Sequence, residues 1–228
     1  MVDRRVARLG GASGILYVLL FIPAYVVGYP DAPTSASGVQ EAFDYFGDEQ
    51  STFLIFNGVL TIFSAFFFVW FLGMLHSVLR RAEGEGVGFS SVALAGGVMF
   101  VVLSWAGVAV EVSYPAASTR FVNFQPDAQL AFLTLAASSW LYHFCQIGTS
   151  VLVSTTSLIA LRTGVLPRWL AWTGFVVALL ALLHFVIPLL SAMVGLLWVA
   201  VVSALMLTGS VRLSTPTRRL GDRGSPTS

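Results

Sequence analysis

Five polar side chains lie within or beside apolar stretches of this 228-residue chain: Asn57, Glu111, His143, Gln146 and His184. Polar groups are costly in membrane hydrocarbon, so those that occur there face the interior of a helical bundle and mark candidate functional sites. A histidine or a carboxylate can exchange a proton or ligate a metal, and an amide can both donate and accept hydrogen bonds. Together the five predict a polar pocket in the outer half of a bundle.

Two of these residues, His143 and Gln146, belong to a longer polar stripe. Its members recur at intervals of 4, 3, 4, 4 and 3, so at about 100° per helical residue they fall on one narrow face. The stripe favours a hydrated path or a ligand pocket. It is equally typical of helix packing, because serine permits close approach and hydrogen-bonds across helices. The stripe consists of Ser139, His143, Gln146, Ser150, Ser154 and Ser157.

Small residues predict where helices approach one another closely. Gly97→Leu is expected to destabilise the chain, because close approach depends on the missing side chain. Gly10 and Gly14 form a GxxxG pattern, which is common at helix interfaces and agrees with a homo-oligomer. The residues predicted to bury against neighbouring helices are Gly97, Ser104, Gly107, Ser150 and Ser154.

Metal and cofactor chemistry receive only limited support. Two histidines and a carboxylate form one kind of catalytic zinc set, and His143 with His184 could ligate haem from two helices. However, no histidine pair has a chelating spacing, and no Walker loop, G-x-S-x-G elbow or H-E-x-x-H motif occurs. The chain contains no lysine, which excludes a retinal Schiff base. We assign no catalytic residue, cofactor ligand or metal ligand, and the cofactor and any enzymatic activity stay open.

Composition and apolar runs predict the elements that position these residues. The chain is 57% hydrophobic and 10% charged, against about 25% charged in soluble domains. Each apolar run is close to the roughly 20 residues that cross a bilayer as a helix. We therefore predict an all-α bundle of six transmembrane helices: 9–29, 53–75, 89–114, one within 130–161, and two within 169–211 that are separated by a hairpin at Pro188.

The distribution of arginine predicts the orientation. Eleven of the twelve arginines fall on one side of a six-span topology, and Arg120 alone falls on the other. Cytoplasmic loops are enriched in basic residues, so both termini are predicted to be cytoplasmic. Residues 1–213 then form one transmembrane domain with an external loop at 30–52, which includes a short amphipathic helix at 37–46, and residues 214–228 form a disordered tail. The net charge of +1 gives no indication of nucleic-acid binding.

Several segments resemble a family of uncharacterised six-helix membrane proteins of actinobacteria, a group defined by a domain of unknown function. The resemblance covers nearly the whole chain and is carried by packing and loop motifs. It implies a multi-pass protein of the bacterial plasma membrane, and it carries no active site over to this chain. The motifs are ARLGGASGILY at 7–17, FDYF at 43–46, WFLG at 70–73, LRRAEG at 79–84, VALAGGV at 92–98 and ALRTGVLPRWLAW at 160–172.

The function expected from these observations is that of a binding, accessory or partner-interacting membrane protein with a polar pocket. A small transporter or channel-like protein is one alternative. A membrane-embedded enzyme, or a metal or haem protein using His143, His184 and Glu111, is another. Expected partners are the lipid bilayer, a small molecule or lipid, and a second copy or another membrane protein. The sequence does not identify the substrate or the oligomeric state.

Overall fold

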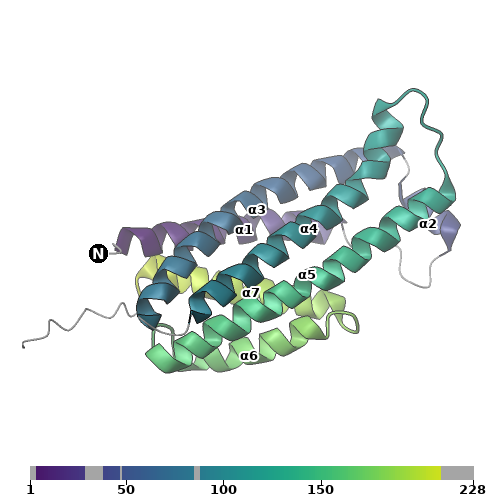
Figure 1. Ribbon diagram of the computed structural model, residues 1–228. Helices are drawn as coiled ribbons and strands as arrows, with labels where there is room; N and C mark the ends of the chain where they lie inside the picture. Colours follow the sequence, from purple (N-terminus) through teal and green to yellow (C-terminus); the bar gives the residue numbers. More distant parts are fainter. Residues whose placement is uncertain (1–3, 29–37, 47, 85–87, 212–228) are drawn as a thin grey trace, which may run out of the picture.

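The computed structural model describes residues 4–28, 38–46, 48–84 and 88–211, and within these ranges every regular element is a helix (Figure 1). The side chains of residues 25–28 and 48–57 lie outside the description, as does the predicted tail at 214–228. The helices are α1 (Arg4–Gly28), α2 (Val39–Tyr45), α3 (Asp48–Glu83), α4 (Phe89–Arg120), α5 (Ala128–Thr163), α6 (Arg168–Leu182) and α7 (Pro188–Thr208).

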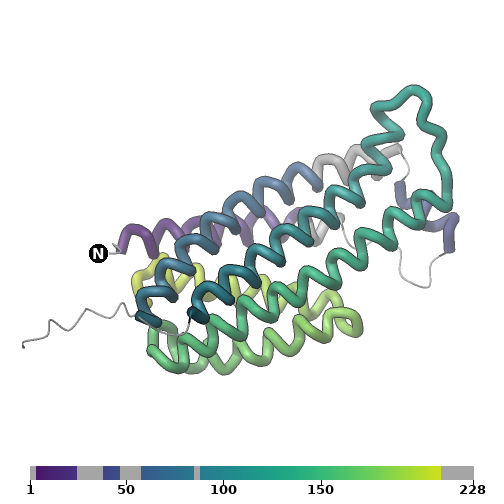
Figure 2. Tube along the Cα trace, viewed as in Figure 1, coloured from purple at the N-terminus to yellow at the C-terminus, as the bar shows by residue number. Residues whose placement is uncertain are grey.

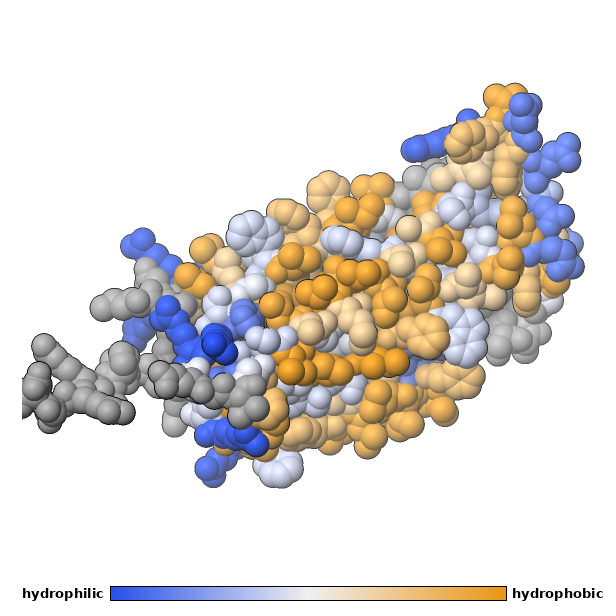
Figure 3. Space-filling model, viewed as in Figure 1, coloured by the Kyte–Doolittle hydropathy of each residue, from blue (hydrophilic) through white to orange (hydrophobic). Residues whose placement is uncertain are grey.

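Five of these helices are long and apolar enough to cross a membrane: α1, α3, α4, α5 and α7. The remaining long apolar segment, α6, is a shorter helix of 15 residues. Figure 3 shows the corresponding surface, with apolar side chains along the length of the bundle and hydrophilic ones gathered at its two ends. The chain therefore has the fold of a multi-pass membrane protein.

Several predicted boundaries were too narrow. Both α3 and α5 have 36 residues, and α4 continues to Arg120 through Pro115, beyond the predicted end at 114. The predicted external loop at 30–52 contains α2 and the start of α3. The short helix predicted at 37–46 is present as α2, but it packs against α5 and buries Ala42 and Tyr45. The apolar block 169–211 divides as predicted, because α6 ends at Leu182 and Pro188 begins α7.

Helix α5 is the central element of the bundle. It packs against α4 along most of its length and against α6 over its C-terminal part, and it also contacts α2 and α3, while α1 packs between α3 and α7 (Figure 2). The helix begins at Asp127, whose carboxylate accepts a hydrogen bond of 2.9 Å from the backbone N–H of Leu130. It ends at Gly164, where φ is +70°. That left-handed conformation is one that glycine adopts without steric cost, so the residue can close the helix.

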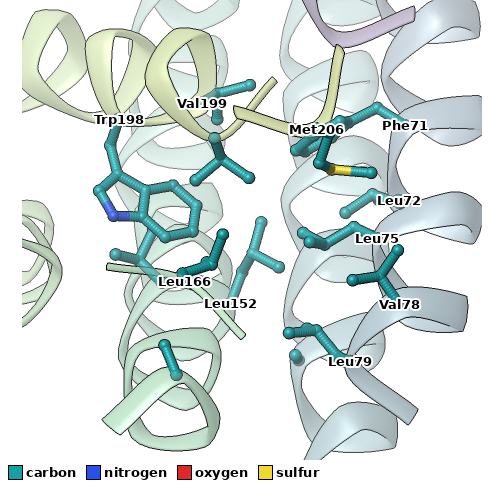
Figure 4. Packing of buried hydrophobic residues seen from close by; sticks show 14 of the residues in the cluster. Phe71, Leu72, Leu75, Val78, Leu79, Leu152, Leu166, Trp198, Val199 and Met206 are labelled. Carbon is teal, nitrogen blue, oxygen red and sulfur yellow. The ribbon is translucent and has the colours of Figure 1, made fainter. Parts of the chain in front are cut away.

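The apolar core lies between α3, α5 and α7. Figure 4 shows Phe71 and Leu75 of α3 facing Met206 of α7. All three side chains are fully buried. The predicted small residues are buried at Gly97, Ser104, Gly107 and Ser150, and Ser154 is half-buried.

The closest approach of α4 and α5 occurs at Gly96 and Gly148. A Cβ atom on Gly148 would lie 2.6 Å from the carbonyl oxygen of Gly96 and 2.6 Å from the backbone nitrogen of Phe100. The two backbones therefore touch, and neither glycine can carry a side chain without separating the helices. Gly97, which was predicted to be a point of close approach, lies instead against the side chain of Leu72 on α3.

The GxxxG pattern of α1 packs against other helices of the same chain. A Cβ atom on Gly10 would lie 2.7 Å from Met206 Cε and 2.7 Å from Met74 Cβ. One on Gly14 would overlap the Ser203 hydroxyl of α7. The pattern therefore serves intramolecular packing against α3 and α7, and it does not support the homo-oligomer inferred from it.

One end of the bundle extends beyond the rest. Helices α3, α4 and α5 continue past the ends of α1, α6 and α7, and α2 lies beside them there (Figure 1). We call the part formed by α2, residues 111–127 and the start of α5 to Leu135 the projecting end. It has a separate small core of Tyr45, Phe46, Tyr114 and Ala131, with Phe43, Phe124 and Leu135 packed against it.

Candidate functional site

The structure divides the five predicted pocket residues among three places. His143 and His184 contact each other, Gln146 lines a cavity at the centre of the bundle, and Glu111 is bound by two tyrosines. The side chain of Asn57 lies outside the described residues. No described contact joins Glu111 to either histidine, so a single site that contains all five residues stays a prediction.

The histidine pair joins α5 to the turn between α6 and α7. The ring centroids of His143 and His184 are 5.2 Å apart with an interplanar angle of 64°. Nδ1 of His184 lies 2.5 Å from the hydroxyl oxygen of Ser191, and that hydroxyl donates to the carbonyl of Pro188 at 2.9 Å. A serine hydroxyl has one proton. Donation to Pro188 uses that proton, and in this arrangement the Ser191 oxygen accepts from Nδ1–H of His184.

Aromatic rings cover the histidine pair. The ring of His143 lies 5.7 Å from that of Trp140 and 5.3 Å from that of Phe185. Its Nδ1 is buried and has no hydrogen-bond partner among the described residues. The described part of the chain contains no group of three histidine, cysteine or acidic side chains close enough to hold a metal ion. The proposed set of two histidines and Glu111 is thus not assembled as a metal site in that part.

Glu111 on α4 accepts hydrogen bonds from two other helices. Its Oε2 accepts a hydrogen bond of 3.2 Å from the Tyr142 hydroxyl on α5, and its Oε1 accepts a longer one of 3.4 Å from the Tyr45 hydroxyl on α2. Both tyrosine hydroxyls donate, so the carboxyl group of Glu111 serves as an acceptor toward two other helices. The arrangement gives Glu111 a structural role, because it links α2 and α5 to α4.

Gln146 lines a cavity of about 40 Å³ between α1, α3, α4, α5 and α7. Its side chain is 8% exposed, and its one hydrogen bond among the described residues is a donation to Cys145 Sγ at 3.7 Å. The amide oxygen therefore has no donor there. Thr149, one turn further along α5, also lines the cavity, and its buried hydroxyl has no partner among the described residues.

The remaining walls of the cavity are mostly apolar, and Tyr17 of α1 adds a hydroxyl-bearing side chain. The residues that line the cavity include no charged side chain. A volume of about 40 Å³ holds a few water molecules or one very small molecule, since one water needs roughly 10–15 Å³ on this measure. The arrangement can bind an uncharged polar molecule by accepting from and donating to its polar atoms.

The polar stripe of α5 has two parts with different roles. Gln146 faces the cavity, whereas Ser154 donates its hydroxyl to the Ser150 carbonyl within α5 at 2.6 Å. Ser157 packs so closely on α6 that a Cβ atom on Gly174 would overlap its hydroxyl. The C-terminal part of the stripe, from Ser150 to Ser157, therefore serves helix packing. The N-terminal part of the stripe begins at Ser139. This residue is exposed, so the prediction that the whole stripe faces inward is wrong at this position.

Sequence reasoning missed three members of these clusters. Thr149 lies three residues after Gln146, so the helical period could have included it. Ser191 lies three residues after the proline of the predicted hairpin, and Tyr17 ends the motif at 7–17. Pairing α1 with α5 across the bundle requires tertiary structure, so no local pattern identifies Tyr17 as a cavity residue.

Comparisons with protein-family models, curated proteins and solved structures give no match to this chain. The arguments about function therefore rest on the residues and contacts described above.

Proposed function

We propose that this chain is a six-span protein of the bacterial plasma membrane, with both termini in the cytoplasm, that binds a small uncharged polar molecule at the centre of its helical bundle. It acts as a binding or accessory protein. The orientation and the ligand are supported by separate observations and can be tested separately.

The six-span topology is supported by the geometry of the α6–α7 hairpin. Helix α6 has 15 residues and is about 22 Å long at 1.5 Å per residue. The turn at 183–187 extends it toward the roughly 30 Å of hydrocarbon. An even number of crossings then places the start of α1 and the end of α7 on one side, together with the arginine-rich loops.

Cysteine labelling tests the topology. Cys145 is the single cysteine and is buried, so a Cys145→Ala background allows one new cysteine at a time. A membrane-impermeant maleimide applied to intact cells should modify cysteine at Asp44 or Asp127 and spare cysteine at Glu85 until the cells are opened. Labelling of the Glu85 position in intact cells would overturn the topology and leave the cavity proposal standing.

The observation that carries the ligand proposal is the incomplete hydrogen bonding of Gln146 at the cavity wall. Leaving a buried polar group unpaired costs about 1–3 kcal/mol, and here the Thr149 hydroxyl is unpaired beside it. A polar molecule in the cavity would pair with both groups. An ion is disfavoured because no charged side chain lines the cavity.

Thermal unfolding of the purified protein in detergent tests the ligand proposal, with formamide, acetamide and glycerol as probes. At least one probe should raise the unfolding temperature in a saturable manner, and Gln146→Leu should abolish the rise. Ser154→Ala is the matched control, because Ser154 bonds within its own helix, and it should retain the rise. No saturable response to any probe, or an unchanged response in Gln146→Leu, would contradict the proposal.

A further inference from the structure

A second concave region lies on the outer surface of the bundle, between α3 and α4. It has a volume of about 310 Å³ and is lined mainly by apolar side chains, with Arg120 at one end and Trp105 at the other. Val59 and Ile62 of α3 form part of one wall and are 46% and 57% exposed. The groove is thus an apolar channel open to the surroundings and closed at one end by a cation.

The length of the groove matches one leaflet of a bilayer. Trp105 and Arg120 are fifteen residues apart on α4, which corresponds to about 22 Å along the helix. Half of a bilayer, including its headgroup region, is about 20–22 Å thick. A lipid chain that lies along the groove can therefore run from the level of the headgroups toward the midplane.

The charge at the end of the groove favours an anionic headgroup. Arg120 is exposed and makes no hydrogen bond or ion pair with the described residues. Arg120 is the one charged side chain that lines the groove and the one described cation of the projecting end, whose other charged side chains are Glu41, Asp44, Glu111 and Asp127. A guanidinium matches a phosphate with two parallel hydrogen bonds.

We propose that this groove binds one molecule of an anionic phospholipid from the leaflet on the side of the projecting end. Its phosphate pairs with Arg120, and one acyl chain lies along Val59, Ile62, Val108 and Val112. The site shares no lining residue with the central cavity. Its test is therefore independent of the test of the small-molecule proposal.

Native mass spectrometry of the detergent-solubilised protein tests the site with phosphatidylglycerol and phosphatidylcholine of identical acyl chains. The wild type should retain phosphatidylglycerol in preference, and Arg120→Gln should reduce the preference about fivefold, as expected for one arginine at an anionic surface. Arg81→Gln removes the same charge at the opposite end of the bundle and should leave the preference unchanged.

A second pair of variants tests the apolar part of the groove. Ala109 is exposed and lines the groove, whereas Ala95 is exposed on the same helix and lies outside it. Ala109→Trp should fill the groove and remove the retained lipid, while Ala95→Trp should not. Equal retention of the two lipids by the wild type would overturn the proposal, as would complete competition by glycerol 3-phosphate, which indicates a small-anion site only. Equal loss in both tryptophan variants would also overturn it.

Discussion

The bundle and the projecting end are held together by different means. In the bundle, α4 meets α5 through the backbones of Gly96 and Gly148, and α1 meets α7 at Gly11 in the same way. In the projecting end, the contacts are made by aromatic rings and hydroxyl groups. Tyr114 packs on Phe46 with ring centroids 4.9 Å apart, and its hydroxyl bonds to the backbone of Asp127.

The difference follows from the solvent that each region is expected to face. Lipid tails are as apolar as the side chains of a helix, so burial of apolar surface gives little driving force and helices associate through close packing at small residues. Toward the headgroup region and the water beyond it, apolar burial again stabilises, at about 25 cal/mol per Å². Large rings that also carry a hydroxyl then serve both burial and hydrogen bonding. Backbone contact at Gly96 and Gly148 and ring contact at Tyr114 and Phe46 therefore correspond to two environments in one bundle.

The largest expected effect is that of Gly148→Ala. The new Cβ atom would meet backbone atoms of Gly96 and Phe100 at 2.6 Å, and backbone cannot move aside as a flexible side chain can. We expect a loss of about 3 kcal/mol or more, at the upper end of the range for overpacking. Reversible unfolding in mixed micelles would measure it.

Two other glycines serve as controls for that variant. A Cβ atom on Gly195 has only Thr149 Cγ2 within 4 Å, at 3.6 Å, so Gly195→Ala should be tolerated. Gly97→Ala should lie between the two, because its closest neighbours all belong to the side chain of Leu72. Equal losses of stability in the three variants would contradict the prediction that the α4–α5 backbone contact makes Gly148 the least tolerant of the three.

The same glycines show how far the sequence predicts the fold. Apolar runs and Pro188 predict the helical segments, because both act through local chemistry. The packing partners could not be predicted in this way. Gly96 and Gly97 are neighbours in sequence, yet one contacts α5 and the other α3. A rotation of about 100° per residue separates them, and only the tertiary arrangement decides which of them meets backbone.

The candidate site shows a similar limit. His143 and His184 were predicted to converge because polar groups in an apolar bundle require partners, and their rings are in contact. Glu111 was grouped with them by its depth along α4. Tyr142 and His143 are adjacent on α5, so they point in different directions, and Glu111 contacts the tyrosine. Depth can be estimated from sequence, but the side of the helix that a distant segment approaches cannot.

A smaller and more local effect is expected for Tyr114→Phe. The hydroxyl of Tyr114 donates to the carbonyl of Asp127 at 3.2 Å and accepts from its N–H at 3.1 Å. The variant keeps the ring contacts but removes the partner of the Asp127 N–H, while the Asp127 carbonyl still accepts from the backbone N–H of Ala131 at 3.0 Å. One unpaired backbone donor costs about 1–3 kcal/mol if it stays buried. Hydrogen exchange should accelerate across 121–131, while residues 145–160 of α5 keep their protection. Acceleration in both segments would mean that the two regions unfold as one unit.

The smallest effect should come from Glu111→Gln, and it separates a structural from a chemical role for this carboxylate. The amide keeps the shape of the side chain and its carbonyl oxygen can still accept from Tyr142, while its NH₂ group can donate to the Tyr45 hydroxyl. In the variant, Tyr142 bonds to an amide oxygen in place of a carboxyl oxygen, and one hydrogen bond contributes about 0.5–1.5 kcal/mol in net terms. The existing bond to Tyr45 is long, at 3.4 Å, so little is lost on that side. The loss falls on the bond to Tyr142, so we expect about 1 kcal/mol of destabilisation, with faster hydrogen exchange where α4 and α5 meet near that residue. Tyr142→Phe, which removes the shorter bond from the other side, should reproduce it. If Glu111→Gln instead abolishes the probe-induced thermal shift that depends on Gln146, then Glu111 belongs to the binding site and the division between the bundle and the projecting end does not hold at this residue.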